Sequence, residues 1–162
     1  MTSFVVTPAF AAHLDRTPGM YAAVADEGRH PETTRVLFAL AEPGTDIVRF
    51  FISESSSERF LKQAAVGRRG CIVAAALADY ETLQYKGTIV EIRPAGEDEL
   101  EGLRRSIDAF CALVGHVGID PARYRAHLEV APFVTVRIAV DGVFDQTPRV
   151  GAGSLVSGSG GL

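Results

Sequence analysis

Residues 35–53 read RVLFALAEPGTDIVRFFIS, which is two apolar runs joined by a short polar segment. Both runs are rich in valine, isoleucine, leucine and phenylalanine, the composition expected of strands that pack against a core. Between them, Glu42, Pro43 and Gly44 form a strong turn signal. The stretch therefore predicts two consecutive strands, residues 35–44 and 46–54, at the opening of a β-meander.

The same strand pattern recurs on both sides of this stretch. Residues 82–93 are the clearest case, because Leu83, Tyr85 and Ile89 alternate with polar side chains. The segment before residue 35, RHPETT, is predicted to be a loop. The remaining predicted strands are residues 20–28, 71–80 and 133–144.

Helical patterns are fewer. The strongest covers residues 97–115, where apolar side chains recur at steps of three and four, acidic residues crowd the first turn, and Gly115 ends the pattern. Thr7 and Pro8 predict an N-cap and the start of a short helix through Leu14. Two further short helices are predicted after residue 55 and after Pro121.

These segments define a fold class. Counting them gives about six strands joined mostly by short turns, each with one apolar face, which favours an antiparallel β-barrel over a parallel sheet. The chain of 162 residues is predicted to be one domain, residues 1–162, because no repeat or linker divides it. An N-terminal helical segment, residues 1–18, and a Gly/Ser-rich C-terminal tail, residues 150–162, flank the barrel.

Composition limits the classes of partner and the compartment. The formal net charge of -4 argues against nucleic acid and anionic membranes as partners, since both require a positive field. The longest apolar run, residues 71–78, is far shorter than the ~20 residues of a spanning helix, and the N-terminus lacks the features of a signal peptide. With only Cys71 and Cys111, both expected to be buried thiols, the sequence predicts a cytoplasmic protein.

No familiar catalytic or metal motif stands out. The four histidines show no metal-ligand spacing, so no metal site is predicted, and each is expected on a helix or at the surface. The acidic run Glu97–Glu101 is interpreted as a helix N-terminus rather than a catalytic carboxylate pair. No side chain is singled out as a catalytic acid or base.

An anion site is the best candidate in the sequence. The segment ISESSSER places Ser53 and Ser57 around a predicted helix N-terminus, where free backbone N–H groups favour a phosphate. Arg59 in the first turn and Arg35 on the neighbouring strand would add charge-assisted hydrogen bonds. The alternative is a serine-capped helix with exposed arginines.

In this order, TTRVLFAL, IVRFFISESSSERFLKQAAVGRRGCIVAAAL, YETLQYKGTIVEI and VFDQTPRVGAG together resemble the pyridoxamine 5'-phosphate oxidase-like, FMN-binding split-barrel proteins over residues 20–153. The resemblance implies a six-stranded split barrel that forms a homodimer with FMN in two clefts at the subunit interface. The cofactor contacts that it implies are Arg35, Val36, Leu37, Ser53, Ser57, Arg59, Thr82, Gln84 and Gln146. For Gln84, the alternative is the solvent face of an alternating strand.

The resemblance also implies a function. It predicts an FMN-binding oxidoreductase that acts on an unidentified small molecule, with a non-catalytic flavin-binding or haem-binding protein as the alternative. The arginine-rich C-terminal motif of the oxidase is missing, so oxidation of pyridoxamine phosphate is not implied. The last strand is expected to end at Phe144, after which Gln146, Thr147 and Pro148 bend the tail across the dimer cleft and bring Gln146 near the partner's flavin.

Overall fold

The computed structural model describes residues 4–17, 19–28, 30–116 and 118–158. Within them, the elements in chain order are α1 (Pro8–Asp15), β1 (Gly19–Ala25), β2 (Pro31–Val36), β3 (Phe38–Ala41), β4 (Ile47–Ser53), the 3-10 helix η1 (Ser55–Ser57), α2 (Glu58–Gln63), β5 (Arg69–Ala75), β6 (Thr82–Pro94), α3 (Glu97–Gly115), α4 (Pro121–Leu128), β7 (Phe133–Asp145) and β8 (Leu155–Gly158).

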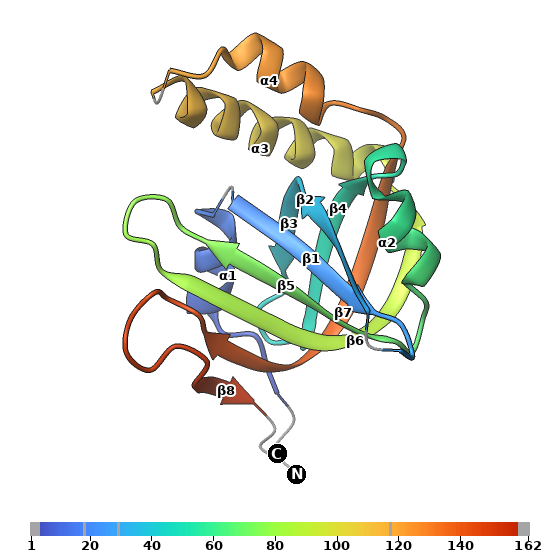
Figure 1. The fold of residues 1–162 in the computed structure, drawn as a ribbon, viewed down its shortest axis with the longest axis vertical. Helices are drawn as coiled ribbons and strands as arrows, with labels where there is room; N and C mark the ends of the chain where they lie inside the picture. Colours follow the sequence, from blue (N-terminus) through green and yellow to red (C-terminus); the bar gives the residue numbers. More distant parts are fainter. Residues whose placement is uncertain (1–3, 18, 29, 117, 159–162) are drawn as a thin grey trace.

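The strands form one antiparallel sheet that curls into a barrel, with α3 and α4 side by side above it in the view of Figure 1. Hydrogen-bonded neighbours follow the order β2-β1-β5-β6-β7-β4-β3, and β8 pairs with β7. The two ends of this path, β2 and β3, are consecutive in the chain. Leu37 lies between them, so at this residue the chain passes from one end of the strand order to the other.

At Leu37 the chain changes its pairing partner. Up to Val36 the strand pairs with β1, whereas the Leu37 amide donates to the Phe51 carbonyl oxygen of β4 at 2.9 Å. Side-chain alternation also changes phase, because Val36 enters the core inside the barrel while Leu37 and Phe38 both enter a second core outside it. The predicted strand 35–44 is therefore two strands at opposite ends of the sheet.

The predicted fold class, a mainly β antiparallel split barrel, is confirmed, and the number of strands differs. The described residues contain an eight-stranded sheet instead of about six strands. The break at Leu37 adds one strand, and β8 adds another. Pro31–Val36, partly predicted as a loop, forms β2, whose first residue is a proline at the edge of the sheet path, where the missing N–H is tolerated.

Two apolar cores hold the fold together. The main core fills the barrel, and α1 packs against it through Leu14, which is 1% exposed. The second core lies between α3 and the outer side of the β3–β4 hairpin, where Ile107 and Phe110 pack with Phe51. Gly102 permits this close approach, because a Cβ atom there would lie 2.9 Å from the Phe38 ring.

Glu99 fixes the start of α3 on the sheet. Its carboxylate accepts hydrogen bonds from Arg93 and Arg49 at 2.8 Å, from Thr135 at 2.9 Å, and from the Gly96 amide at 2.8 Å. The side chain is 4% exposed. The Arg93 guanidinium, followed by the other donors, lowers the Glu99 pKa to about 2. As predicted, the acidic run begins a helix; Glu99 itself is a buried anchor.

The helices behave largely as the sequence predicts. Thr7 caps α1, its hydroxyl accepting from the Phe10 amide at 3.3 Å, and α3 and α4 lie within the expected ranges. In the predicted N-terminal segment, residues 1–3 and 18 lie outside the described residues. In the described part of the chain, no helix combines the length and apolar character that a membrane crossing requires.

After the bend at Gln146, the described part of the C-terminal segment stays beside β7 of its own chain. It turns back and forms β8, which pairs antiparallel with β7 so that Leu155 lies opposite Phe144. Within the turn, the Gly153 amide donates to the Asp145 carbonyl oxygen at 2.6 Å. Residues 159–162 of the predicted tail lie outside the described residues.

Candidate functional site

The predicted cofactor contacts fall into two places in the fold. Residues 53–59, which we call the serine turn, join β4 to α2 and lie beside β2. Thr82, Gln84 and Gln146, which we call the amide cluster, lie where β6 begins and β7 ends. The remaining predicted contacts lie at the end of β2, the strand beside the serine turn, and at the break that follows it. They are Arg35, Val36 and Leu37.

Buried hydroxyl groups anchor the serine turn. The Ser53 hydroxyl donates to the Val130 carbonyl oxygen at 2.6 Å, and the Ser57 hydroxyl lies 2.6 Å from that of Thr34 on β2. Ser53 is 4% and Ser57 2% exposed. Both predicted serines therefore hold the turn on the barrel, while Ser55 and Ser56 face solvent.

The two predicted arginines lie on different sides of β2. The Arg59 side chain is 81% exposed and pairs with Glu32 at 2.6 Å. Arg35 lies on the outer face, with its guanidinium 4.6 Å from the centre of the Phe110 ring and 5.4 Å from that of Tyr21. Arg35 thus contacts aromatic rings on the outer face, and Arg59 is the cation that the serine turn itself carries.

Val36 and Leu37 present no free side chain to a ligand. Val36 is fully buried in the main core, and Leu37 belongs to the second core. Both backbone groups of Leu37 are also occupied, because its amide bonds to Phe51 and its carbonyl oxygen accepts from the Ser106 hydroxyl at 3.1 Å. A ligand at this position would therefore find no free side chain of Val36 or Leu37 to bind.

The three predicted polar residues of the amide cluster are brought together. The Gln146 side-chain amide donates to the Gln84 side-chain oxygen at 2.9 Å, and the Gln146 backbone amide donates to the Thr82 carbonyl oxygen at 2.7 Å. The Gln84 amide nitrogen lies 3.4 Å from the Cys71 sulfur. Both glutamine side chains are half-buried. The predicted bend at Gln146 thus docks onto the start of β6.

Asp145 stabilises this bend. Its carboxylate accepts from the Thr147 backbone amide at 2.8 Å and from Arg149 at 2.6 Å. The Arg149 guanidinium, followed by Thr147, lowers the Asp145 pKa to about 2. Arg149 therefore bonds within its own turn.

Strand register relates Arg35 to the amide cluster along the outer face of the sheet. One cross-strand row runs from Arg35 to Tyr21, Val73, Gln84 and Phe144. Arg35 and Gln84 are three strand spacings apart, which is about 14 Å at ~4.8 Å per strand. Within one chain, Arg35 and the amide cluster are therefore well separated on the outer face, and the serine turn lies beside β2, the strand that carries Arg35.

Three residues of this face were missed by sequence reasoning. Tyr21 is 52% exposed in the middle of the row, and Phe110 of α3 lies under Arg35. Cys71, expected to be buried, is half-buried beside Gln84; Cys111 is buried, and burial raises the pKa of its thiol. Alternation in β1 indicates that Tyr21 points opposite to Met20, but the cross-strand partners depend on a register that one sequence does not reveal.

The histidines do not assemble a metal centre. In the described ranges, no three His, Cys, Asp or Glu side chains lie close enough to hold a metal ion. His13 is buried in α1, and its Nδ1 atom lies 3.1 Å from the Tyr85 hydroxyl. Burial lowers the pKa of His13 and raises that of Tyr85. This pair belongs to the barrel interior.

Comparison with known proteins identifies the fold. No protein-family model matches the sequence, and no curated protein matches it. Among solved structures, HupZ of Group A Streptococcus matches with 13% identity over 92% of this chain and 98% of its own, at a TM-score of 0.53. An F420 reductase matches with 15% identity over 85% and 98%, at a TM-score of 0.54.

A pyridoxamine 5'-phosphate oxidase-related, FMN-binding protein from Nostoc punctiforme superposes less well, with 13% identity over 86% of this chain and 84% of its own and a TM-score of 0.46. At such identities the likeness concerns the fold, and it is established by HupZ and the F420 reductase. Together with the strand order and the break at Leu37, it shows that the chain has the split-barrel fold of the pyridoxamine 5'-phosphate oxidase-like proteins.

Proposed function

We propose that the protein is a flavin-binding homodimer that holds FMN between the serine turn of one subunit and the amide cluster of the other, and uses it in a redox reaction on a small molecule. The observation that carries this proposal is that β2, which the serine turn contacts, lies three strand positions away from β6 and its amide cluster within one chain. Each offers polar groups suited to one end of a flavin nucleotide, and a second copy can bring the complementary region to each.

The serine turn is suited to the phosphate. Arg59 is exposed, and its only partner among the described residues is Glu32, an exchangeable ion pair at the surface. Ser55 and Ser56 expose hydroxyl groups at the same turn. A phosphate would accept hydrogen bonds from these groups and compete with Glu32 for Arg59. Ser53 and Ser57 would hold the turn in place.

The amide cluster is suited to the flavin ring. The pyrimidine edge of a flavin carries both hydrogen-bond donors and acceptors, and the amides of Gln84 and Gln146 supply both. Their mutual hydrogen bond of 2.9 Å uses one donor and one acceptor and leaves others for a ligand. The neighbouring Cys71 would supply a less polar contact along the ring, and the Lys86 ammonium, 4.2 Å from the centre of the Phe144 ring, adds a positive charge nearby.

Exposed apolar residues on this side of the molecule support a dimer. Tyr21 on β1 is 52% exposed, and Leu77 and Tyr80 in the β5–β6 turn are 46% and 67% exposed. Leu155 on β8 is 50% exposed. Through the strand register, Tyr21 and Leu155 belong to the same outer-face row as Gln84 and Phe144, and exposed apolar side chains along one face are suited to a protein interface. A second subunit covering them would also enclose a ligand on the outer face.

A bound flavin itself supplies the redox chemistry, while the protein supplies binding, orientation and exclusion of water. No side chain of the site is assigned as a catalytic acid or base. A protein that binds the flavin without turnover is the alternative. Turnover with NAD(P)H and candidate acceptors would distinguish the two.

The proposal is tested by titrating the purified protein with FMN and following flavin fluorescence. We expect saturable binding that Arg59→Ala weakens about tenfold, the loss typical of one charge-assisted hydrogen bond. Lys62→Ala is the matched control, because Lys62 is a cation one turn further along α2. An absence of FMN binding, or equal losses in both variants, would refute the proposal.

A further inference from the structure

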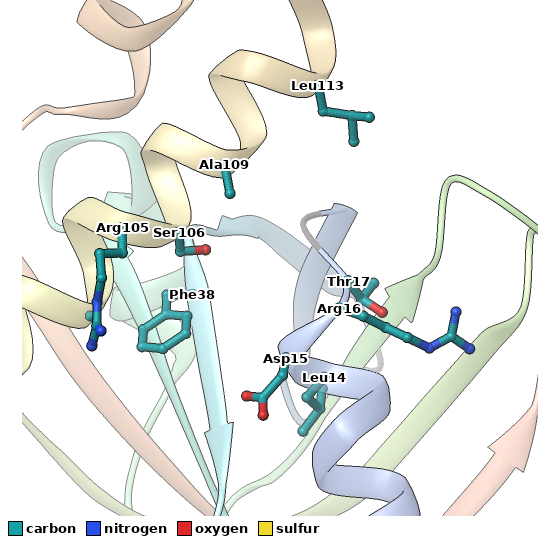
Figure 2. Close-up of a pocket in the computed structure, with 10 residues that line it drawn as sticks. Leu14, Asp15, Arg16, Thr17, Phe38, Arg105, Ser106, Ala109 and Leu113 are labelled. Carbon is teal, nitrogen blue, oxygen red and sulfur yellow. The ribbon is translucent and has the colours of Figure 1, made fainter.

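A cavity outside the proposed flavin site lies between α1 and α3. Its volume is about 530 Å³, within the range of small-molecule sites. Figure 2 shows that its walls come from the end of α1, from Phe38 at the start of β3, and from one face of α3. The α3 residues that line it are Gly102, Arg105, Ser106, Ala109 and Leu113.

Most of the cavity wall is apolar. Ala109 and Leu113 contribute aliphatic surface, and the half-buried Phe38 ring adds an aromatic surface. Phe38 also stacks on Phe51, with ring centres 5.6 Å apart, so a packed core supports the ring from behind. The apolar body of a ligand would therefore rest on a fixed aromatic surface.

Most polar groups of the cavity are already bonded within the protein. The Thr17 hydroxyl donates to the His13 carbonyl oxygen, the Ser106 hydroxyl donates to Leu37, and Arg16 pairs with acidic residues of the β5–β6 turn. In Figure 2 the Arg16 side chain extends away from α3. These groups stabilise the wall and leave little capacity for a ligand.

Asp15 and Arg105 are the exceptions. Both are charged and exposed, both line the cavity, and neither has a hydrogen-bond or ion-pair partner among the described residues. They come from facing walls, Asp15 from α1 and Arg105 from α3. In the view of Figure 2 the Phe38 ring lies between them, and no ion pair joins them. The cavity thus presents one negative and one positive charge across an apolar surface.

We propose that this cavity binds a small zwitterion with an apolar side chain, of which an apolar α-amino acid is the simplest case. The ammonium group of the ligand pairs with Asp15, its carboxylate pairs with Arg105, and its side chain packs on Phe38 and Leu113. A simple anion meets Asp15 unfavourably, and a simple cation meets Arg105 unfavourably. The charge pattern therefore selects a ligand that carries both charges.

The test is titration of the ligand-free protein with L-phenylalanine, followed by calorimetry and ligand-observed NMR. We expect binding in the millimolar range, and we expect 3-phenylpropionate and phenethylamine, which each lack one charge, to bind at least about fivefold more weakly. Equal binding of all three probes, or no binding of L-phenylalanine, would overturn the proposal. No flavin is present, so the result is independent of the proposed function.

Single-residue variants test whether Asp15 and Arg105 bind the ligand. Arg105→Gln and Asp15→Asn are each expected to weaken L-phenylalanine binding at least about fivefold. Ala109→Phe is expected to abolish binding by filling the cavity from an exposed helix position, without loss of thermal stability. Arg104→Gln is the matched control, because Arg104 is the neighbouring exposed cation outside this cavity. A loss with Arg104→Gln as large as with Arg105→Gln would contradict the assignment.

Discussion

Glu99 and the amide cluster are both polar sites on the barrel, but their surroundings differ. Glu99 is 4% exposed and accepts hydrogen bonds from two arginines, a threonine and a backbone amide. Gln84 and Gln146 are uncharged and half-buried, and they share one hydrogen bond. The first site has its hydrogen-bonding capacity filled within the protein, whereas the second retains capacity for a ligand.

The difference separates polar groups that hold the fold from polar groups that can bind a ligand. A buried charge must be fully paired because removing one partner leaves an uncompensated group, which is costly. A half-exposed amide can exchange water for a ligand at little cost. We therefore expect substitutions at Glu99 to change stability, and substitutions at Gln84 and Gln146 to change binding.

Substitution of Glu99 should change stability more than any other substitution considered below. Glu99→Gln removes the charge that pairs with Arg49 and Arg93 and is expected to lower the free energy of unfolding by about 3 kcal/mol, the amount that corresponds to a pKa lowered from 4.5 to about 2. Urea denaturation measures this. Glu97→Gln, an exposed position in the same helical turn, is the control and should change stability by under about 0.5 kcal/mol. Equal effects would contradict the anchoring role.

The hydrogen bonds and ion pairs of Glu99 should also make the protein less stable in acid. Because the pKa of Glu99 in the folded state lies below that in the unfolded state, its contribution is present above pH 4.5 and is lost as the pH falls toward 2. The wild type should therefore lose more stability over this interval than Glu99→Gln. Denaturation curves at a series of pH values test this, and parallel pH profiles for the two proteins would argue against it.

His13 should affect the free energy of unfolding at a higher pH than Glu99 does, and by a smaller amount. Burial lowers its pKa in the folded state, so the unfolded chain takes up the proton first and stability falls as the pH drops below about 6.5. His13→Gln should remove this part of the pH dependence and leave the Glu99 interval unchanged. If the variant keeps the wild-type slope between pH 6.5 and 5, the proton uptake belongs to another group.

The smallest effect on stability is expected at the amide cluster. Gln84→Ala combined with Gln146→Ala should change the free energy of unfolding by about 1 kcal/mol or less, the value of one ordinary hydrogen bond. The same double variant should weaken FMN binding by about tenfold or more. Thermal denaturation and FMN titration on one preparation measure both. A loss of stability comparable to that of Glu99→Gln would make the cluster a structural element.

The sequence was sufficient for the fold class because turn signals and alternation are local. It could not reveal the break at Leu37, since Val36, Leu37 and Phe38 are all apolar and the change of face leaves no mark in their composition. The turn-back of the tail depends on pairing with β7, which is a tertiary contact. These differences arise where strand partners, rather than local preference, decide the structure.

The candidate site was predictable to a different degree at its two ends. The resemblance named Thr82, Gln84 and Gln146 as separate cofactor contacts, and the structure shows that they lie together. The separation of Arg35 from Arg59 was not predicted, because it depends on which face of β2 each side chain approaches. The spacing of the two arginines in the sequence does not show which face of β2 each side chain approaches.

In the proposed dimer, one flavin site combines the serine turn of one subunit with the amide cluster of another. Mixing two binding-deficient double variants tests this arrangement. One carries Arg59→Ala and Ser55→Ala, the other carries Gln84→Ala and Gln146→Ala, and the two are folded together and titrated with FMN. In a random mixture, half of the dimers contain both variants, and each of these has one intact site. We predict recovery of about a quarter of wild-type FMN binding. Two inactive variants that remain inactive when mixed would contradict a site shared between subunits.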